Sequence, residues 1–196
     1  MKKTFKIEPP IDTNTVVLHS CCAPCSSAIV EALLKINIKP IIFYYNPNIY
    51  PSEEYNKRKD ECKRFAQLNN LTQFDADYNH NEWLEYIKGY ESDCERGQRC
   101  LLCFKMRMLK TAQFALANNI PLFTTTLASS RWKDLEQINQ AGIFAQQQTS
   151  VMFWSQNWRK GGLQQRRNEL LKEYAFYNQL YCGCEFSKAQ QQNKPQ

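Results

Sequence analysis

Short apolar runs alternate with amphipathic helical patterns along this chain, and this alternation constrains the fold more than any other feature. Runs rich in β-branched and aromatic residues are typical of buried parallel strands. The predicted strands span residues 15–20, 41–45, 71–75 and 122–126, with a weaker candidate at 151–154. The predicted helices span residues 26–36, 53–68, 101–117, 134–147 and 164–177. We therefore expect an α/β fold with a mostly parallel sheet flanked by helices.

The domain organisation is expected to be simple. The chain has 196 residues and shows neither an internal repeat nor a Gly/Ser-rich linker, which predicts one catalytic domain over residues 1–196. The polar residues at 188–196 are expected to form a frayed tail. No apolar run approaches the ~18 residues of a membrane span, and the basic start lacks the apolar core of a secretory signal. We therefore expect no membrane partner and a reducing, cytoplasmic compartment.

Nine cysteines in such a compartment call for a role other than disulfide bonding, and seven of them fall into three clusters. The clusters are Cys21-Cys22-Ala23-Pro24-Cys25, Cys100-Leu101-Leu102-Cys103 and Cys182-Gly183-Cys184. Buried single cysteines are common, but clusters with ligand spacing predict metal binding. Ligand sets made only of thiolates favour zinc or iron–sulfur clusters. The two remaining cysteines, Cys62 and Cys94, are expected to be structural.

Three interpretations of the thiols remain open. The pairs Cys22/Cys25 and Cys100/Cys103 would supply the four ligands of zinc in a tRNA-binding module. The segment Cys22-Ala23-Pro24-Cys25, between a strand and a helix, is similar to the redox motif of thioredoxin-like dithiol oxidoreductases. A [4Fe–4S] cluster takes four thiolates, and seven candidates then leave three for a second metal.

Loops that follow parallel strands are where α/β proteins bind their ligands. Asn46 and Asn48 follow the second predicted strand and are candidate substrate-binding residues, with turn formation as the alternative role. Basic residues point to a polyanionic partner, because the net charge is +6. Arg159 and Lys160 precede a Gly-Gly pair and are candidates for contacts with RNA phosphates.

Aromatic residues near the basic segments suggest stacking with unpaired bases. Trp154 and Trp158 lie close to Arg159 in the sequence. A second group of basic residues flanks the middle cysteine pair, namely Arg96, Arg99, Lys105, Arg107 and Lys110. A solvated basic surface is the alternative interpretation of both groups.

In their order along the chain, these motifs resemble the epoxyqueuosine reductases of the QueH family, from about residue 16 to residue 187. The matching segments are Leu18–Cys25, Phe43–Ile49, Arg99–Cys103, Phe123–Ser130, Arg159–Gly162 and Tyr181–Ser187. The resemblance implies a sheet related to the adenine nucleotide alpha-hydrolase-like (HUP) fold. The cysteine loop then stands where that group has a phosphate-binding loop, so ATP use is not expected.

The resemblance also implies the activity. Enzymes of this family reduce epoxyqueuosine to queuosine in the wobble position of tRNA, the last step of queuosine biosynthesis. The conversion removes one oxygen as water and consumes two electrons and two protons. No dinucleotide-binding motif is visible in the sequence, so an external electron donor is expected. The candidate proton donors are Tyr44, Tyr45, Lys133 and Asp134.

The resemblance also implies a [4Fe–4S] cluster with a mononuclear iron nearby. By this resemblance the cluster ligands are Cys21, Cys100, Cys103 and Cys182. The ligands of the second metal are Cys22, Cys25 and Cys184, and neighbouring cysteines can exchange between the two sets. In some relatives an aspartate stands at the position of Cys25, so the thiolate here is a softer ligand that alters the preference for the second metal.

Overall fold

The computed structural model describes residues 6–76 and 78–192. Within these residues, five strands form one sheet in the order β3-β2-β1-β4-β5, and every pairing is parallel. The strands are β1 Thr15–His19, β2 Lys39–Tyr44, β3 Gln73–Asp75, β4 Leu122–Thr125 and β5 Met152–Phe153. The central strand β1 and its neighbour β4 are buried on both faces, which is why their sequences read as continuous apolar runs. The predicted α/β fold class is confirmed.

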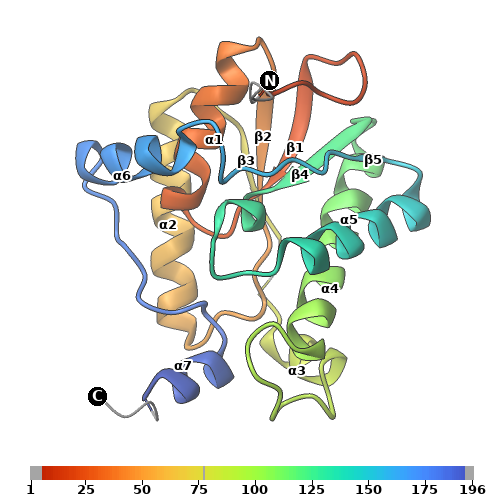
Figure 1. The fold of residues 1–196 in the computed structure, drawn as a ribbon, viewed down its shortest axis with the longest axis vertical. Helices are drawn as coiled ribbons and strands as arrows, with labels where there is room; N and C mark the ends of the chain where they lie inside the picture. The colour runs from red at the N-terminus through yellow and green to blue at the C-terminus, as the bar shows by residue number, and fades with distance from the viewer. Residues whose placement is uncertain (1–5, 77, 193–196) are drawn as a thin grey trace, which may run out of the picture.

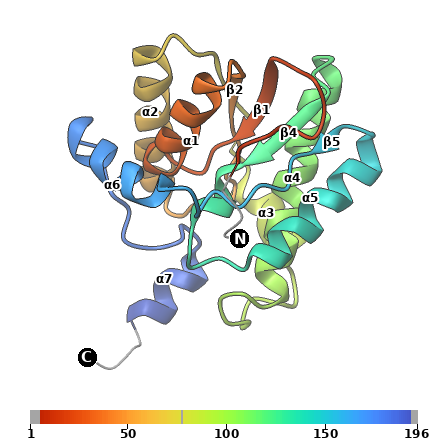
Figure 2. The same cartoon turned by 45° about the horizontal axis from the view of Figure 1, so that its top comes forward.

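Helices cover both faces of the sheet. They are α1 Ala23–Lys35, α2 Ser52–Leu68, α3 His80–Tyr86, α4 Gln98–Ala117, α5 Leu135–Thr149, α6 Leu163–Glu173 and α7 Glu185–Gln192. Figure 1 shows α1, α2 and α6 on one side of the sheet and α4 and α5 on the other, and Figure 2 shows the same division from a second direction. None of these helices is both long and apolar enough to cross a membrane.

Two helices were not predicted from the sequence. Helix α3 is two turns long and has one buried residue, Trp83, so it carries no clear periodic signal. Helix α7 begins directly after Cys184 and extends through residues 188–192, part of the segment expected to be a frayed tail. Residues 193–196 of that segment lie outside the described residues.

The order of the strands reverses direction at β1. The chain moves from β1 to β2 on one side and later returns to place β4 on the other side of β1. The segments that leave β1 and β4 therefore diverge, and such a point is where open parallel sheets bind ligands. A hydrogen bond of 2.8 Å between His19 Nδ1 and Thr125 Oγ1 joins the two strand ends. The Cys21–Cys25 loop leaves from this point.

Helix α5 packs closely on β5 through Gly142. A Cβ atom at Gly142 would lie 2.2 Å from Cε1 of Phe153, which is far inside van der Waals contact. Gly142→Ala is therefore expected to lower the free energy of unfolding by about 1–3 kcal/mol, through overpacking. This loss outweighs the roughly 1 kcal/mol that alanine normally adds to a helix.

Urea denaturation measures this effect. Gln147→Ala, on the exposed side of the same helix, is the control and should show no loss. An unchanged or higher midpoint for Gly142→Ala would contradict the close approach of α5 to β5.

Candidate metal centre

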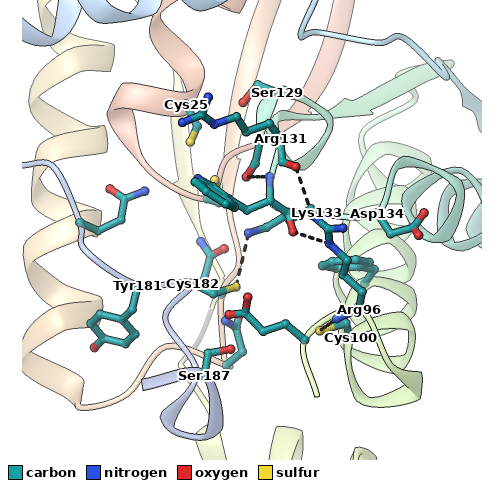
Figure 3. A pocket seen from close by; sticks show the side chains of 18 of the residues that line it. Cys25, Arg96, Cys100, Ser129, Arg131, Lys133, Asp134, Tyr181, Cys182 and Ser187 are labelled. Carbon is teal, nitrogen blue, oxygen red and sulfur yellow. Dashed lines mark hydrogen bonds between the residues drawn. The ribbon is translucent and has the colours of Figure 1, made fainter. Parts of the chain in front are cut away.

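A cavity of about 1040 Å³ opens at the carboxyl edge of the sheet, where the strand order reverses. Its walls come from the loops that follow β1, β2 and β4, from the start of α4, and from the segment after α6. We call that last segment, residues 174–184, the C-terminal arm. Figure 3 shows Cys25, Cys100 and Cys182 around this cavity, each contributed by a different part of the chain. All nine cysteines of the protein are free thiols.

The first group of thiols lies at the start of α1. The sulfur atoms of Cys21, Cys22 and Cys25 are all within 4.8 Å of one another. Cys22 is the N-cap of α1 and Pro24 lies in its first turn, so the loop and the helix start bring the three side chains together. Hydrogen bonds from Cys22 and Cys25 hold the pKa of Cys21 well below its usual range. The thiolate is the form of cysteine that binds metals.

The second group combines the start of α4 with the C-terminal arm. Burial raises the pKa of Cys100 to about 12, and its neighbour Cys182 adds to the rise. Cys182 also raises the pKa of Cys103 and, after burial, that of Cys184, which reaches about 11. Cys182 thus acts electrostatically on Cys100, Cys103 and Cys184. Lys133 is influenced by both Cys182 and Cys21, so the two groups of thiols share one cationic neighbour.

Arg58 on α2 holds the C-terminal arm in place. Its Nη1 and Nη2 atoms donate hydrogen bonds of 3.3 Å to the carbonyl oxygens of Cys182 and Tyr181. Its Nε donates to Glu54 Oε1 at 2.7 Å, and both side chains of this ion pair are nearly buried. Gly183 permits the close approach, because its φ is +122° and a Cβ there would lie 3.0 Å from Cγ1 of Ile49.

Lys133 extends from the loop before α5 into the thiols. Its Nζ lies 3.3 Å from Cys182 Sγ, the contact drawn in Figure 3. Burial lowers the pKa of Lys133, but Cys182 and Cys21 outweigh this effect, so the pKa lies above its usual range. The side chain is therefore an ammonium ion at neutral pH. Arg159 fixes this loop, since its Nη2 donates to the Lys133 carbonyl oxygen at 2.7 Å.

Arg107 is a buried cation, 2% exposed. It has no carboxylate partner among the described residues. Its Nη2 donates to Asn46 Oδ1 at 2.5 Å, and its Nη1 lies 3.9 Å from Cys103 Sγ. Its Nε lies 3.4 Å from His19, whose pKa is lowered to about 3 by burial and by Arg107 itself. Because a buried charge needs a counter-charge, the thiolates and whatever they bind must supply it.

The two asparagines predicted to bind substrate differ in their contacts. Asn46 is fully buried and donates from Nδ2 to the Ser20 carbonyl oxygen at 2.9 Å, while its oxygen accepts from Arg107. Asn48 is also buried and lines the cavity, but its Oδ1 has no hydrogen-bond partner among the described residues. This oxygen is therefore an unpaired acceptor, within the described part of the chain, that is closed to solvent.

The other predicted residues differ in their positions relative to the cavity. The Tyr44 hydroxyl donates to the Tyr55 carbonyl oxygen inside the core, and Tyr45 lines a separate groove. Asp134 lines the cavity, and its Oδ1 also accepts the backbone N–H groups of residues 136 and 137 as the N-cap of α5. Lys160 is exposed and is not among the residues that line the cavity.

The prediction that two tryptophans stack on RNA bases is wrong. Trp154 and Trp158 are 3% and 0% exposed, because both pack into the core beside β4. Arg99 and Arg107 are buried as well, so they are not part of a phosphate-binding surface. The prediction that Cys62 is a core residue is confirmed.

The sequence interpretation missed the structural roles of Arg58, Arg107 and Trp132. Arg107 had a usable signal, since it follows Cys103 by four residues and so lies on the same helix face. Arg58 had none in this context, because its partners on the arm are 123 and 124 residues away. The exposed Trp132 lies in a loop without periodicity.

The fold and the site define an α/β protein whose clustered thiols, at the carboxyl edge of the sheet, form a candidate metal centre. The model of the family "Epoxyqueuosine reductase QueH" matches residues 16–190. The chain belongs to this family of oxidoreductases.

Curated relatives with the same name agree. The protein from Histophilus somni is 48% identical over 183 residues, which cover 93% of this chain and 75% of the relative. The Haemophilus influenzae protein is 46% identical with the same coverage, and the Acinetobacter baylyi protein is 44% identical, with 95% and 86% covered. A crystal structure of a predicted subunit of tRNA methyltransferase from Methanocaldococcus jannaschii shares the fold, with a TM-score of 0.57, 11% identity and coverage of 86% and 94%.

The ion pair between Arg58 and Glu54 leads to a prediction about the arm. Arg58→Met removes both hydrogen bonds to the arm, and it also removes the main cationic partner of Glu54. The expected result is a loss of about 3–5 kcal/mol in the free energy of unfolding, as for other broken buried pairs. Chymotrypsin should then cleave faster after Leu180 or Tyr181.

Arg64→Met is the matched control. Arg64 also comes from α2 and donates to the arm at the Tyr174 carbonyl oxygen, but its side chain is 41% exposed. We expect a loss below about 1 kcal/mol for this variant. Equal cleavage rates for the two variants would contradict a special role of Arg58.

Proposed function

We propose that the protein reduces epoxyqueuosine in tRNA to queuosine, the last step of queuosine biosynthesis, and that the chain acts as one catalytic domain in the cytoplasm. The observation that carries this proposal is that all three cysteine clusters reach one cationic cavity, lined by Cys21, Cys25, Cys100 and Cys182, in a chain of this family. Relatives with up to 48% identity carry the name epoxyqueuosine reductase.

Cationic groups around the cavity support a polyanionic substrate. Seven cationic residues line it, namely Arg58, Arg96, Arg107, Arg131, Lys133, Arg159 and Arg167. Only two carboxylates among the described residues do so, those of Glu95 and Asp134. A cavity of this size and charge suits a modified nucleotide with its flanking phosphates. Of the two residues predicted to contact RNA, Arg159 and Lys160, we propose that Arg159 contacts the substrate.

The donor set fits a [4Fe–4S] cluster with a second metal ion, because seven thiols exceed the four that one cluster takes. We propose Cys100, Cys103, Cys182 and Cys184 as the cluster ligands, because Cys182 acts electrostatically on the other three. Cys21, Cys22 and Cys25 then remain for the second ion, for which we propose iron. This division differs from the sequence prediction by the exchange of Cys21 with Cys184.

When bound, such a cluster would supply electrons one at a time, obtained from an external donor. The reaction itself consumes two electrons and two protons, forms the ring double bond and releases the epoxide oxygen as water. Lys133 carries a proton on Nζ at the cavity floor and is our candidate for its delivery. Asn48, which lines the cavity, is our candidate for a contact with the substrate.

The activity is tested with anaerobically purified protein, a chemical reductant and tRNA that contains epoxyqueuosine. Digestion to nucleosides and mass spectrometry should show loss of epoxyqueuosine and gain of queuosine. A colourless, zinc-loaded protein without turnover would instead favour the zinc-binding module. A metal-free protein with a titratable dithiol would favour the dithiol oxidoreductase.

Single cysteine variants test the proposed ligand sets. Cys25→Ala should keep the visible iron–sulfur absorbance but lose turnover, because its thiol belongs to the second ion. Cys184→Ala should lose the absorbance, whereas Cys21→Ala should keep it. Iron content and visible spectra of the purified variants measure this, with the exposed Cys94→Ser as the control. The opposite result for Cys21 and Cys184 would restore the division predicted from the sequence.

Arg107 should stabilise the more negative, reduced state of a neighbouring cluster. Arg107→Met is therefore expected to make reduction at least tenfold less favourable, which is ~59 mV for a one-electron couple. Redox titration monitored by electron paramagnetic resonance measures the potential. Arg107→Lys keeps the charge and should stay closer to the wild type. Equal potentials in the Met variant and the wild type would show that the guanidinium is not coupled to the cluster.

A further inference from the structure

Trp132 is an exposed tryptophan at the edge of the cavity. Trp132 is 67% exposed and lines the same cavity as the thiols. The other three tryptophans, Trp83, Trp154 and Trp158, are buried. An exposed indole leaves a large apolar face in water, so its presence at the edge of a polar cavity points to a ligand that covers it.

The backbone around Trp132 is held by hydrogen bonds from two sides. Arg96 Nε donates to the Trp132 carbonyl oxygen at 3.0 Å. On the other side, Arg159 donates to the carbonyl oxygen of the next residue, Lys133. Gln137 in turn donates to the Arg96 carbonyl oxygen at 2.7 Å, which joins the two loops. The indole is therefore presented on a fixed loop, and little backbone order needs to be gained on binding.

Positive charge surrounds the indole. The Arg131 guanidinium carbon lies 4.9 Å from the centre of the Trp132 ring. Arg96, Arg131 and Lys133 all line the same cavity as Trp132 and are labelled in Figure 3. An aromatic face among cations is the combination that binds single-stranded nucleic acid, since the cations pair with phosphates and the ring stacks on a base.

We propose that Trp132 stacks on an unpaired base of the RNA loop, next to the nucleotide that enters the cavity. This inference rests on the proposed tRNA substrate and assigns one contact to it. The thiols at the cavity floor receive the modified base, and Trp132 at the edge receives a neighbouring base. The stacking role that the sequence suggested for Trp154 and Trp158 thus belongs to a different tryptophan.

The test uses the anaerobically purified protein and a synthetic RNA hairpin with an unpaired anticodon-type loop. Trp132→Ala should weaken binding about tenfold, in line with the loss of one base–aromatic stack. Trp132→Phe keeps an aromatic face and should retain most of the affinity. Leu116→Ala removes an exposed apolar side chain outside the cavity, 54% exposed, and should bind like the wild type.

Two further readouts separate stacking from charge. The part of the intrinsic fluorescence that acrylamide can quench should come from Trp132. Bound RNA should lower this emission and shield it from acrylamide in the wild type, and neither effect should appear in Trp132→Phe. Trp132→Ala should also leave the slope of affinity against salt unchanged, because no phosphate contact is lost. Arg131→Ala should reduce that slope.

The outcomes distinguish the two proposals. If the wild type binds no RNA hairpin, the proposed tRNA substrate is contradicted. If the wild type binds but Trp132→Ala binds equally well, or if RNA leaves the fluorescence unchanged, only the stacking role is overturned. Equal weakening by Leu116→Ala would also overturn it, because the effect would then be one of general apolar area.

Discussion

The carboxyl ends of β1 and β4 lie side by side, and the hydrogen bond between His19 and Thr125 joins them at 2.8 Å. Everything at the site depends on this junction. The chain leaves β1 through the cysteine loop toward α1 and leaves β4 through the 3-10 helix at Thr126–Ser129. Because these exits diverge, a space remains that neither strand fills. The start of α4 and the C-terminal arm close its other sides.

Electrostatic balance is the second constraint on the site. Arg107 and Lys133 bring positive charge among buried or half-buried thiols, and Arg58 adds its charge where the arm crosses α2. A cation without a counter-ion would be costly in this environment, as would several unpaired thiolates. Arg107 lies in the interior, although its sequence position beside Cys103 suggested a surface contact with RNA.

The sequence was informative where local pattern and burial coincide. Strands β1, β2 and β4 were predicted because burial on both faces produces uninterrupted apolar runs, and the three cysteine clusters were predicted by their spacing. Other features depend on partners far along the chain. Arg58 looks like one member of an i,i+4 pair with Glu54, and only the fold shows its bonds to the arm. The sequence alone does not distinguish Trp132 from Trp158, yet Trp132 is exposed and Trp158 is buried.

The C-terminal arm has a consequence for how the protein is assembled. Arg58 and Cys182 are 124 residues apart, and Gln179 reaches back 157 residues to Cys22 with a contact of 2.9 Å. Contacts of such long range form late, since the chain entropy of a large loop must be lost before they bring any gain. During synthesis, the cysteines of α1 and α4 emerge long before those of the arm. The three cysteine clusters therefore come together only once translation has passed residue 184, so a metal held by thiols from all three would load only after the arm has folded.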